Sequence, residues 1–164
     1  MANGGIIGPT KVVNTPTTRT ESFTGSGTFQ KSNCTSTIPE VLVVGGGGGA
    51  SSTQPVGNST GGGGAGGYRN SYASETSGRN SSTETPLELT AGNTYTITVG
   101  GGGATSSDGN AAAGEGVDSS ISGTGITTVT SIGGGAQLAS SDARGYGGSD
   151  GGCGGGGGAN YSAG

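Results

Sequence analysis

Short apolar strands that run directly into uninterrupted glycines are the most restrictive feature of this sequence. Residues 40–44 are followed by five glycines from Gly45, and residues 95–99 by four glycines from Gly100. A weaker third instance is 127–132, which precedes three glycines. The recurrence indicates an architectural unit. No fixed period separates the copies, which argues against a solenoid with a countable repeat.

The glycine runs leave the chain two outcomes. They have no side chains to bury, and glycine loses more backbone freedom on ordering than any other residue. Ordering most of the 42 glycines costs roughly 20 to 40 kcal/mol relative to alanine, at about 0.5 to 1 kcal/mol each. The runs therefore either stay disordered as linkers or pack as extended left-handed polyglycine II helices that exchange N–H···O=C bonds. The strands that precede them favour packing.

Outside the glycine runs, the sequence predicts antiparallel strands. Four consecutive apolar residues at 41–44 indicate a central strand covered on both faces. The triplet 25–27 predicts a hairpin that brings Phe23 and Phe29 into a small core. The expected strands are 20–24, 28–30, 41–44, 86–90, 95–99, 119–122 and 127–132, with 20–24 paired to 28–30 and 86–90 paired to 95–99 about a turn at 91–93.

The predicted fold class is mostly β with polyglycine II helices: small antiparallel β-sheets plus packed glycine-rich segments, with little or no α-helix. Only 27% of the residues are apolar, so one chain could hardly close such a thin core alone. We therefore expect a fibre-like homotrimer. Residues 20–164 are expected to form this glycine-rich β/polyglycine II domain.

Residues 1–19 have a different character. They contain two prolines and many β-branched residues without an amphipathic period, so they are expected to be extended and to lack a core of their own. They form either a floppy terminus or an N-terminal docking arm held by another protein. The candidate docking residues are Ile6, Ile7, Pro9, Val12 and Val13.

Composition argues against several partners. The net charge of −4 and the scattered basic residues do not fit nucleic acid, because phosphate binding needs clustered Lys and Arg. No stretch approaches the roughly 18 apolar residues of a membrane span, so no membrane insertion is expected. The N-terminus lacks the basic region and apolar core of a secretory signal. We expect assembly in a reducing cytoplasm.

No residue set for catalysis, cofactor binding or metal binding is evident. The chain has no histidine and no nucleophile-elbow motif, so we expect it not to be an enzyme. Gly45, Gly47 and Ala50 formally fit a dinucleotide fingerprint, but no helix can follow them. Scattered aspartates fit no calcium motif and are more simply solvated loop residues. Cys34 and Cys153 are expected to be inert buried thiols, with a disulfide as the alternative.

Tyrosines and arginines beside the glycine runs are candidates for receptor contact. Singly exposed aromatics are ordinary, which is the simpler interpretation. The functional interpretation is a stacking surface for sugar rings, with arginines as hydrogen-bond donors. The candidates are Tyr68, Arg69, Tyr72, Arg79, Arg144 and Tyr146.

An ordered combination of segments carries a family resemblance. It consists of residues 22–29, the strand and glycines at 41–49, the glycines and tyrosine at 61–68, and residues 89–102. Together they are similar to the glycine-rich domain of phage tail-fibre and related virion proteins. In that family, and in the glycine-rich adhesins of T-even-like tail fibres, polyglycine II helices form a rigid sandwich whose end loops touch the bacterial receptor.

The resemblance implies a phage virion surface fibre protein, a tail-fibre or tip component involved in host-cell attachment. Its partners would be other virion proteins, reached through the arm, and a host surface glycan or protein. The alternatives are a structural capsid-decorating or head fibre protein without receptor binding, or a non-viral extracellular glycine-rich protein. The candidate contact loops are 50–60, 69–85, 104–118 and 137–150.

Overall fold

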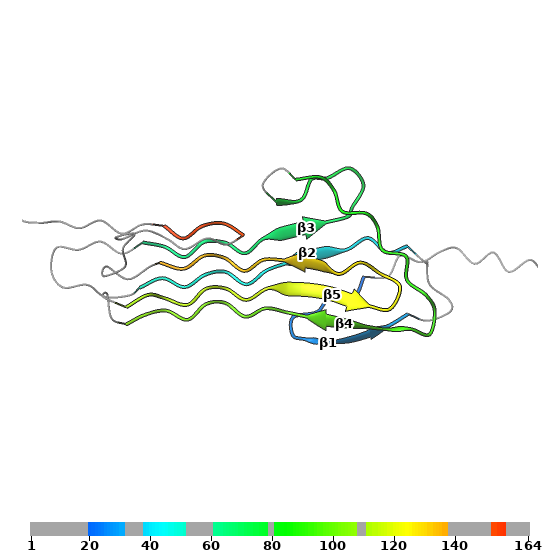
Figure 1. The fold of residues 1–164 in the computed structure, drawn as a ribbon, viewed down its shortest axis with the longest axis horizontal. Coiled ribbons are helices and arrows are strands. Elements are labelled where there is room, and N and C mark those ends of the chain that lie inside the picture. Colours follow the sequence, from blue (N-terminus) through cyan, green and yellow to red (C-terminus); the bar gives the residue numbers. More distant parts are fainter. Residues whose placement is uncertain are drawn as a thin grey trace, which may run out of the picture.

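The computed structural model describes residues 20–31, 38–51, 61–78, 81–107, 111–137 and 152–156; the expected arm at 1–19 lies outside them. The described part is elongated, with the strands at one end and the glycine-rich segments at the other (Figure 1). It contains no α-helix and is mostly β. The strands are β1 (Gly27–Gln30), β2 (Leu42–Val44), β3 (Tyr68–Asn70), β4 (Thr94–Thr98), β5 (Ser119–Gly123) and β6 (Val129–Ser131).

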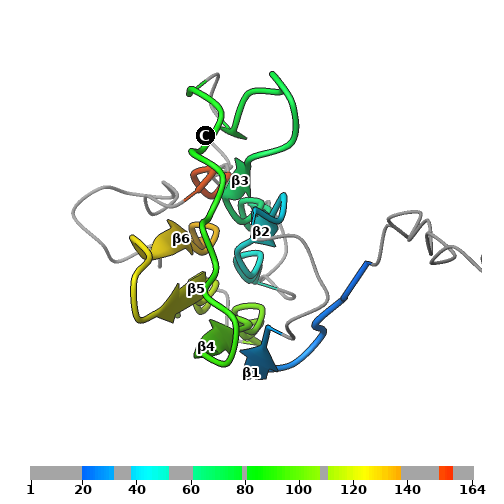
Figure 2. The same cartoon turned by 90° about the vertical axis from the view of Figure 1, so that its right-hand side faces the viewer.

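Two antiparallel sheets enclose the core at the strand end. The first has the order β1-β4-β5-β6, and the second consists of β2 and β3. Viewed end-on in Figure 2, β2 and β3 lie beside the β5–β6 part of the larger sheet. Between them lies an apolar cluster in which Tyr95 is fully buried. The buried members are Leu87, Leu89, Tyr95, Ile121 and Val129, and Phe29, Val41, Val43, Ile97 and Ile126 pack against them.

The prediction of a central strand at 41–44 is wrong. β2 pairs with β3 in a sheet of only two strands. Val43 packs toward the core, whereas Leu42 and Val44 are 61% and 53% exposed. Successive side chains of a strand point to opposite faces, and in the described part of the chain the face of β2 that carries Leu42 and Val44 is left largely uncovered. One face of β2 therefore remains apolar and open.

Both predicted hairpins are also wrong. β4 has β1 along one edge and β5 along the other, so neither 86–90 nor any other segment can pair with it. Residues 20–24 form no strand, and β1 pairs with β4 across the sheet. Leu87 and Leu89 keep the predicted alternation, but they lie in the core rather than in a sheet.

The turn at 91–93 is confirmed, with Gly92 at φ +82°. The strands at 119–122 and 127–132 are confirmed as β5 and β6.

The glycine-rich segments lie side by side and bond through their backbones (Figure 1). Donors three residues apart reach the same neighbour: Gly45 N donates to Gly67 O at 3.0 Å and Gly48 N to Gly64 O at 2.8 Å. The adjacent donor, Gly46, reaches a different segment through Val117 O at 3.0 Å. Each segment thus repeats its contacts every three residues. The segments are 45–49, 61–67, 100–104, 113–117, 132–137 and 152–156.

Close backbone approach makes glycine necessary inside this array. A Cβ at buried Gly134 would lie 2.1 Å from Gly64 O and 2.7 Å from Gly48 N, both backbone atoms. At Gly101, on the exposed side, a Cβ would meet nothing within 4 Å. The array therefore tolerates side chains at its outer positions and excludes them between segments.

Candidate functional site

Three of the four expected contact loops start from one end of the glycine-rich segments. Ser51 lies near the start of the first of these loops, 50–60, and it forms a parallel bridge with Ser106 of the second. The Ser51 amide also donates to Oε1 of Gln137, where the third loop begins, at 3.0 Å. The structure assigns 113–117 of the expected loop 104–118 to a glycine-rich segment, which shortens that loop. The starting points of three separate loops are thus held together.

Gln137 organises this end through both its backbone and its side chain. Its amide donates to Gly49 O at 3.3 Å, and its carbonyl accepts from Ala113 N at 3.0 Å. With its side-chain oxygen bound to Ser51, this residue is only 2% exposed. We call Ser51, Ser106, Ala113 and Gln137 the end clamp. Sequence reasoning missed it, because a single glutamine after a glycine run has no feature that distinguishes it from a solvated loop residue.

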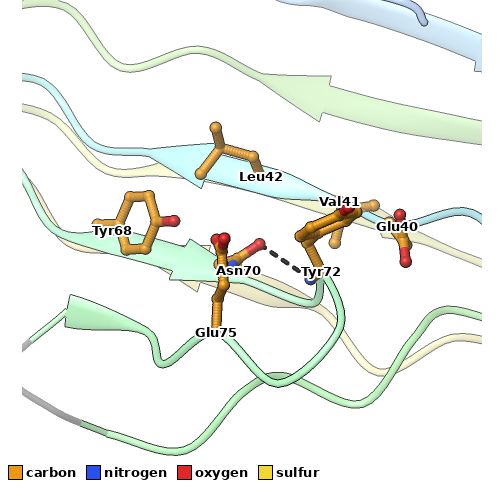
Figure 3. Close-up of a pocket in the computed structure, with 7 residues that line it drawn as sticks. All are labelled: Glu40, Val41, Leu42, Tyr68, Asn70, Tyr72 and Glu75. Carbon is orange, nitrogen blue, oxygen red and sulfur yellow. Dashed lines mark hydrogen bonds between the residues drawn. The ribbon is translucent and has the colours of Figure 1, made fainter.

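A groove lies at the opposite, strand end of the protein (Figure 3). We call it the strand-end groove; its volume is about 300 Å³. The β2–β3 register places Leu42 opposite Asn70 and Val44 opposite Tyr68, so these four side chains share one face of the two-stranded sheet. The residues that line the groove are Glu40, Val41, Leu42, Tyr68, Asn70, Tyr72 and Glu75.

Asn70 fixes the shape of the groove. It is 3% exposed, and its Oδ1 accepts from the Tyr72 amide at 2.9 Å. Its Nδ2 donates to Oε2 of Glu75 at 3.3 Å. Glu40 and Glu75 lie on either side of Tyr72 in the view of Figure 3. The groove therefore combines apolar and aromatic surface with two carboxylates, which suits a ligand that is partly apolar and positively charged.

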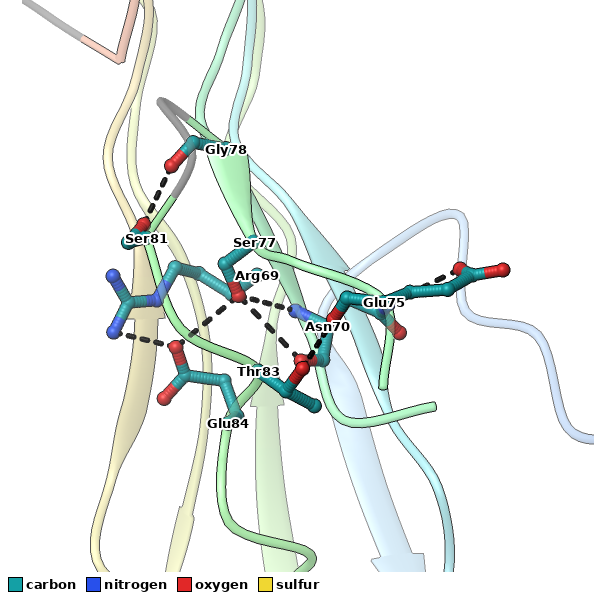
Figure 4. Close-up of polar contacts among 8 residues, drawn as sticks. All are labelled: Arg69, Asn70, Glu75, Ser77, Gly78, Ser81, Thr83 and Glu84. Carbon is teal, nitrogen blue, oxygen red and sulfur yellow. Dashed lines mark hydrogen bonds and ion pairs between the residues drawn. The ribbon is translucent and has the colours of Figure 1, made fainter. Parts of the chain in front are cut away.

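Arg69 projects from the other face of β3 and is already paired. Its guanidinium lies 2.7 Å from Oε1 of Glu84 (Figure 4). The same carboxylate oxygen accepts from Ser77 Oγ at 3.3 Å. That hydroxyl in turn accepts from the backbone N–H of Asn70 at 3.1 Å. The Glu84 amide closes the network by donating to Asn70 O at 2.8 Å. Arg69 thus holds Glu84 and Ser77 against β3 in this structure.

The predicted receptor-contact residues do not form one surface among the described residues. Tyr68 and Tyr72 share the strand-end groove, whereas Arg69 faces away from it. Glu40 and Glu75 were missed, because 69–85 was interpreted as a loop and the pairing of β2 with β3 was not foreseen. Candidates outside the described residues are Arg79, Arg144 and Tyr146, together with the docking candidates Ile6, Ile7, Pro9, Val12 and Val13.

Cys153 differs from its prediction. Its thiol is free and exposed, not buried. Its backbone is engaged on both sides, donating to Ala65 O and accepting from Gly135 N, each at 2.9 Å, which leaves the side chain to point outward. Cys34 lies outside the described residues.

The described ranges contain no cluster of three or more His, Cys, Asp or Glu side chains suited to a metal ion. Across the same ranges, no helix has the length and apolar character needed to cross a membrane.

A family model for a glycine-rich domain matches residues 19–164, a range that includes every described residue. No curated protein and no solved structure matches the chain.

Proposed function

The chain belongs to the glycine-rich domain family, and from this premise we propose that it is a phage virion surface fibre protein, a tail-fibre or tip component that contributes to host-cell attachment. Its glycine-rich segments act as polyglycine II helices that form a rigid spacer. Backbone donors that return to the same neighbour every third residue support this assignment, because that helix has three residues per turn.

The end clamp carries the functional proposal. It joins the starting points of three polar loops at the end of the spacer, through Ser51, Ser106 and Gln137. Loops held on a rigid scaffold are the usual site of recognition. We assign contact with a host surface glycan or protein to this end, where Arg144 and Tyr146 fall within the loop that starts at Gln137.

The strand end then faces the virus particle. In this arrangement the arm, which precedes β1, connects to other virion proteins, and the copies associate as a homotrimer. The protein has no catalytic role and needs no cofactor. The exposed apolar face of β2 and β3 supports association, because a monomer would leave Leu42 and Val44 in water.

The attachment function is tested with the full chain on intact cells from a panel of bacterial strains. In one variant, residues 52–60 and 138–150 are replaced by Gly/Ser stretches of the same length; in the matched control, Thr124→Ala alters the exposed turn between β5 and β6 at the strand end instead. We expect the loop variant to lose at least about tenfold in cell binding, equivalent to about 1.4 kcal/mol, and the control to keep it. Unchanged binding of the loop variant would refute the assignment of contact to these loops. No binding of the wild-type chain to any strain would refute attachment and favour the purely structural fibre.

A further inference from the structure

The open face of β2 and β3 presents several large apolar side chains together. Leu42, Val44 and Tyr72 are each more than half exposed, and Tyr68 is 37% exposed. Singly exposed apolar residues are ordinary, but a contiguous patch marks an interaction surface. The patch continues into the strand-end groove, so the same partner would contact both.

The charge of the groove restricts the partner. Glu40 and Glu75 contribute two carboxylates, and no Lys or Arg is among the residues that line it. Negative charge beside tyrosine rings favours binding of a cation, because both the carboxylates and the faces of the rings attract positive charge. The expected occupant is an extended segment with a basic residue next to apolar ones.

The arm of this chain has that chemistry. Residues 1–19 contain Lys11 and Arg19 and no Asp or Glu, although the whole chain has a net charge of −4. Lys11 is followed by Val12 and Val13. In an extended strand, Lys11 and Val13 project to the same side, about 7 Å apart. A single short stretch can therefore place a cation and an apolar side chain on one surface.

The start of the described chain indicates that the arm reaches another copy. Residues 20–28 are all exposed. Figure 2 shows the segment that precedes β1 running away from the two sheets. Phe23 and Ser26 still contact Phe29 and Val99 of the same copy, so it is the chain before Phe23 that is placed to lead to another copy.

We propose that the strand-end groove of one copy binds residues 10–13 of the arm of a second copy. Lys11 lies between Glu40 and Glu75, and Val13 packs on Leu42. The contact joins two different surfaces, so it is heterologous and closes into a ring when the rotation between copies permits. This proposal rests on the homo-oligomer of the proposed function and names the contact that builds it.

Charge exchange tests the contact in the full chain. The measurement is mass by light scattering over a concentration series. Lys11→Glu is expected to weaken association about tenfold, because an attractive pair becomes a repulsive one. Combining it with Glu40→Lys, which leaves the Asn70–Glu75 bond of the groove intact, is expected to restore most of the loss. Arg19→Glu makes the same charge change outside the bound stretch, and it is expected to leave the mass unchanged.

A labelled peptide of residues 6–15 gives a second measurement that does not depend on assembly. It is expected to bind the Lys11→Glu protein, whose groove is intact, and to bind Leu42→Asp at least about tenfold more weakly. The proposal would be overturned if the wild-type protein is a monomer or if Lys11→Glu leaves the mass unchanged. It would also be overturned if the charge exchange in the groove does not restore association of Lys11→Glu. No cells are involved, so these results are independent of whether the protein attaches to a host.

Discussion

Substituting a single buried glycine by alanine should destabilise this protein as much as removing a large core side chain. Gly134 lies in the middle of the array, where its Cβ would be placed 2.1 Å from Gly64 O and 2.7 Å from Gly48 N. Both are backbone atoms, so no flexible side chain can move aside. The segments themselves must separate.

The magnitude follows from the contacts that are lost. Overpacking in a tight interior costs about 1 to 3 kcal/mol. Separation also stretches the bonds from Gly134 N to Gly46 O, at 2.7 Å, and from Gly48 N to Gly64 O, at 2.8 Å. Each is worth about 0.5 to 1.5 kcal/mol. We expect Gly134→Ala to lower the free energy of unfolding by about 4 kcal/mol, a large part of the roughly 5 to 15 kcal/mol of a typical domain.

Gly101→Ala provides the matched control, with the same chemical change and the opposite expected sign. Nothing lies within 4 Å of the added Cβ, and φ is not in the left-handed region. Alanine at this position reduces the conformational freedom of the unfolded chain. It should therefore raise the free energy of unfolding by about 0.4 to 1 kcal/mol.

Urea unfolding at one fixed protomer concentration measures both variants. The midpoints should move in opposite directions with similar slopes. Equal midpoints for Gly134→Ala and Gly101→Ala would refute the close packing of the segments.

Other substitutions test the remaining parts of the fold. Gln137→Ala removes a buried acceptor from the end clamp and should lower the free energy of unfolding by about 1 to 3 kcal/mol in the same urea assay; an unchanged midpoint would show that the clamp is dispensable. Tyr95→Phe deletes the hydroxyl that accepts from the Thr90 backbone N–H at 2.8 Å. This change should lower the free energy of unfolding by about 1 to 2 kcal/mol. Glu84→Gln breaks the pair with Arg69, whose side chain is 39% exposed, and should change stability by less than about 1 kcal/mol, with a smaller effect at high salt. A salt-independent loss of several kcal/mol would contradict this view of the pair.

Much of the fold class could be predicted from local pattern. The mostly β character, the small antiparallel sheets and the near absence of helix follow from short β-branched strands and glycine runs. The strand pairing could not be predicted, because turn residues such as 25–27 and 91–93 suggested local hairpins. The structure instead pairs β1 with β4 across a long separation in sequence, which only the shared core around Tyr95 decides.

The candidate sites were predicted less well, for a related reason. Tyr68 and Tyr72 stood out because they are aromatic residues near glycines, and the structure brings both to one groove. Glu40 and Glu75 join them only through the pairing of β2 with β3 and the turn that Asn70 fixes. The β2–β3 pairing connects positions 24 to 28 residues apart, and no local pattern encodes it.

Amide hydrogen exchange of the glycine-rich segments tests the central claim most directly, that backbone-to-backbone bonding makes these segments rigid. The amides of Gly48, Gly64 and Gly134 each donate to a neighbouring segment. They should exchange as slowly as the amides of the strand core, near the limit set by global unfolding. Exchange of these amides at the rate of an unstructured chain would contradict the claim, and with it the rigid spacer.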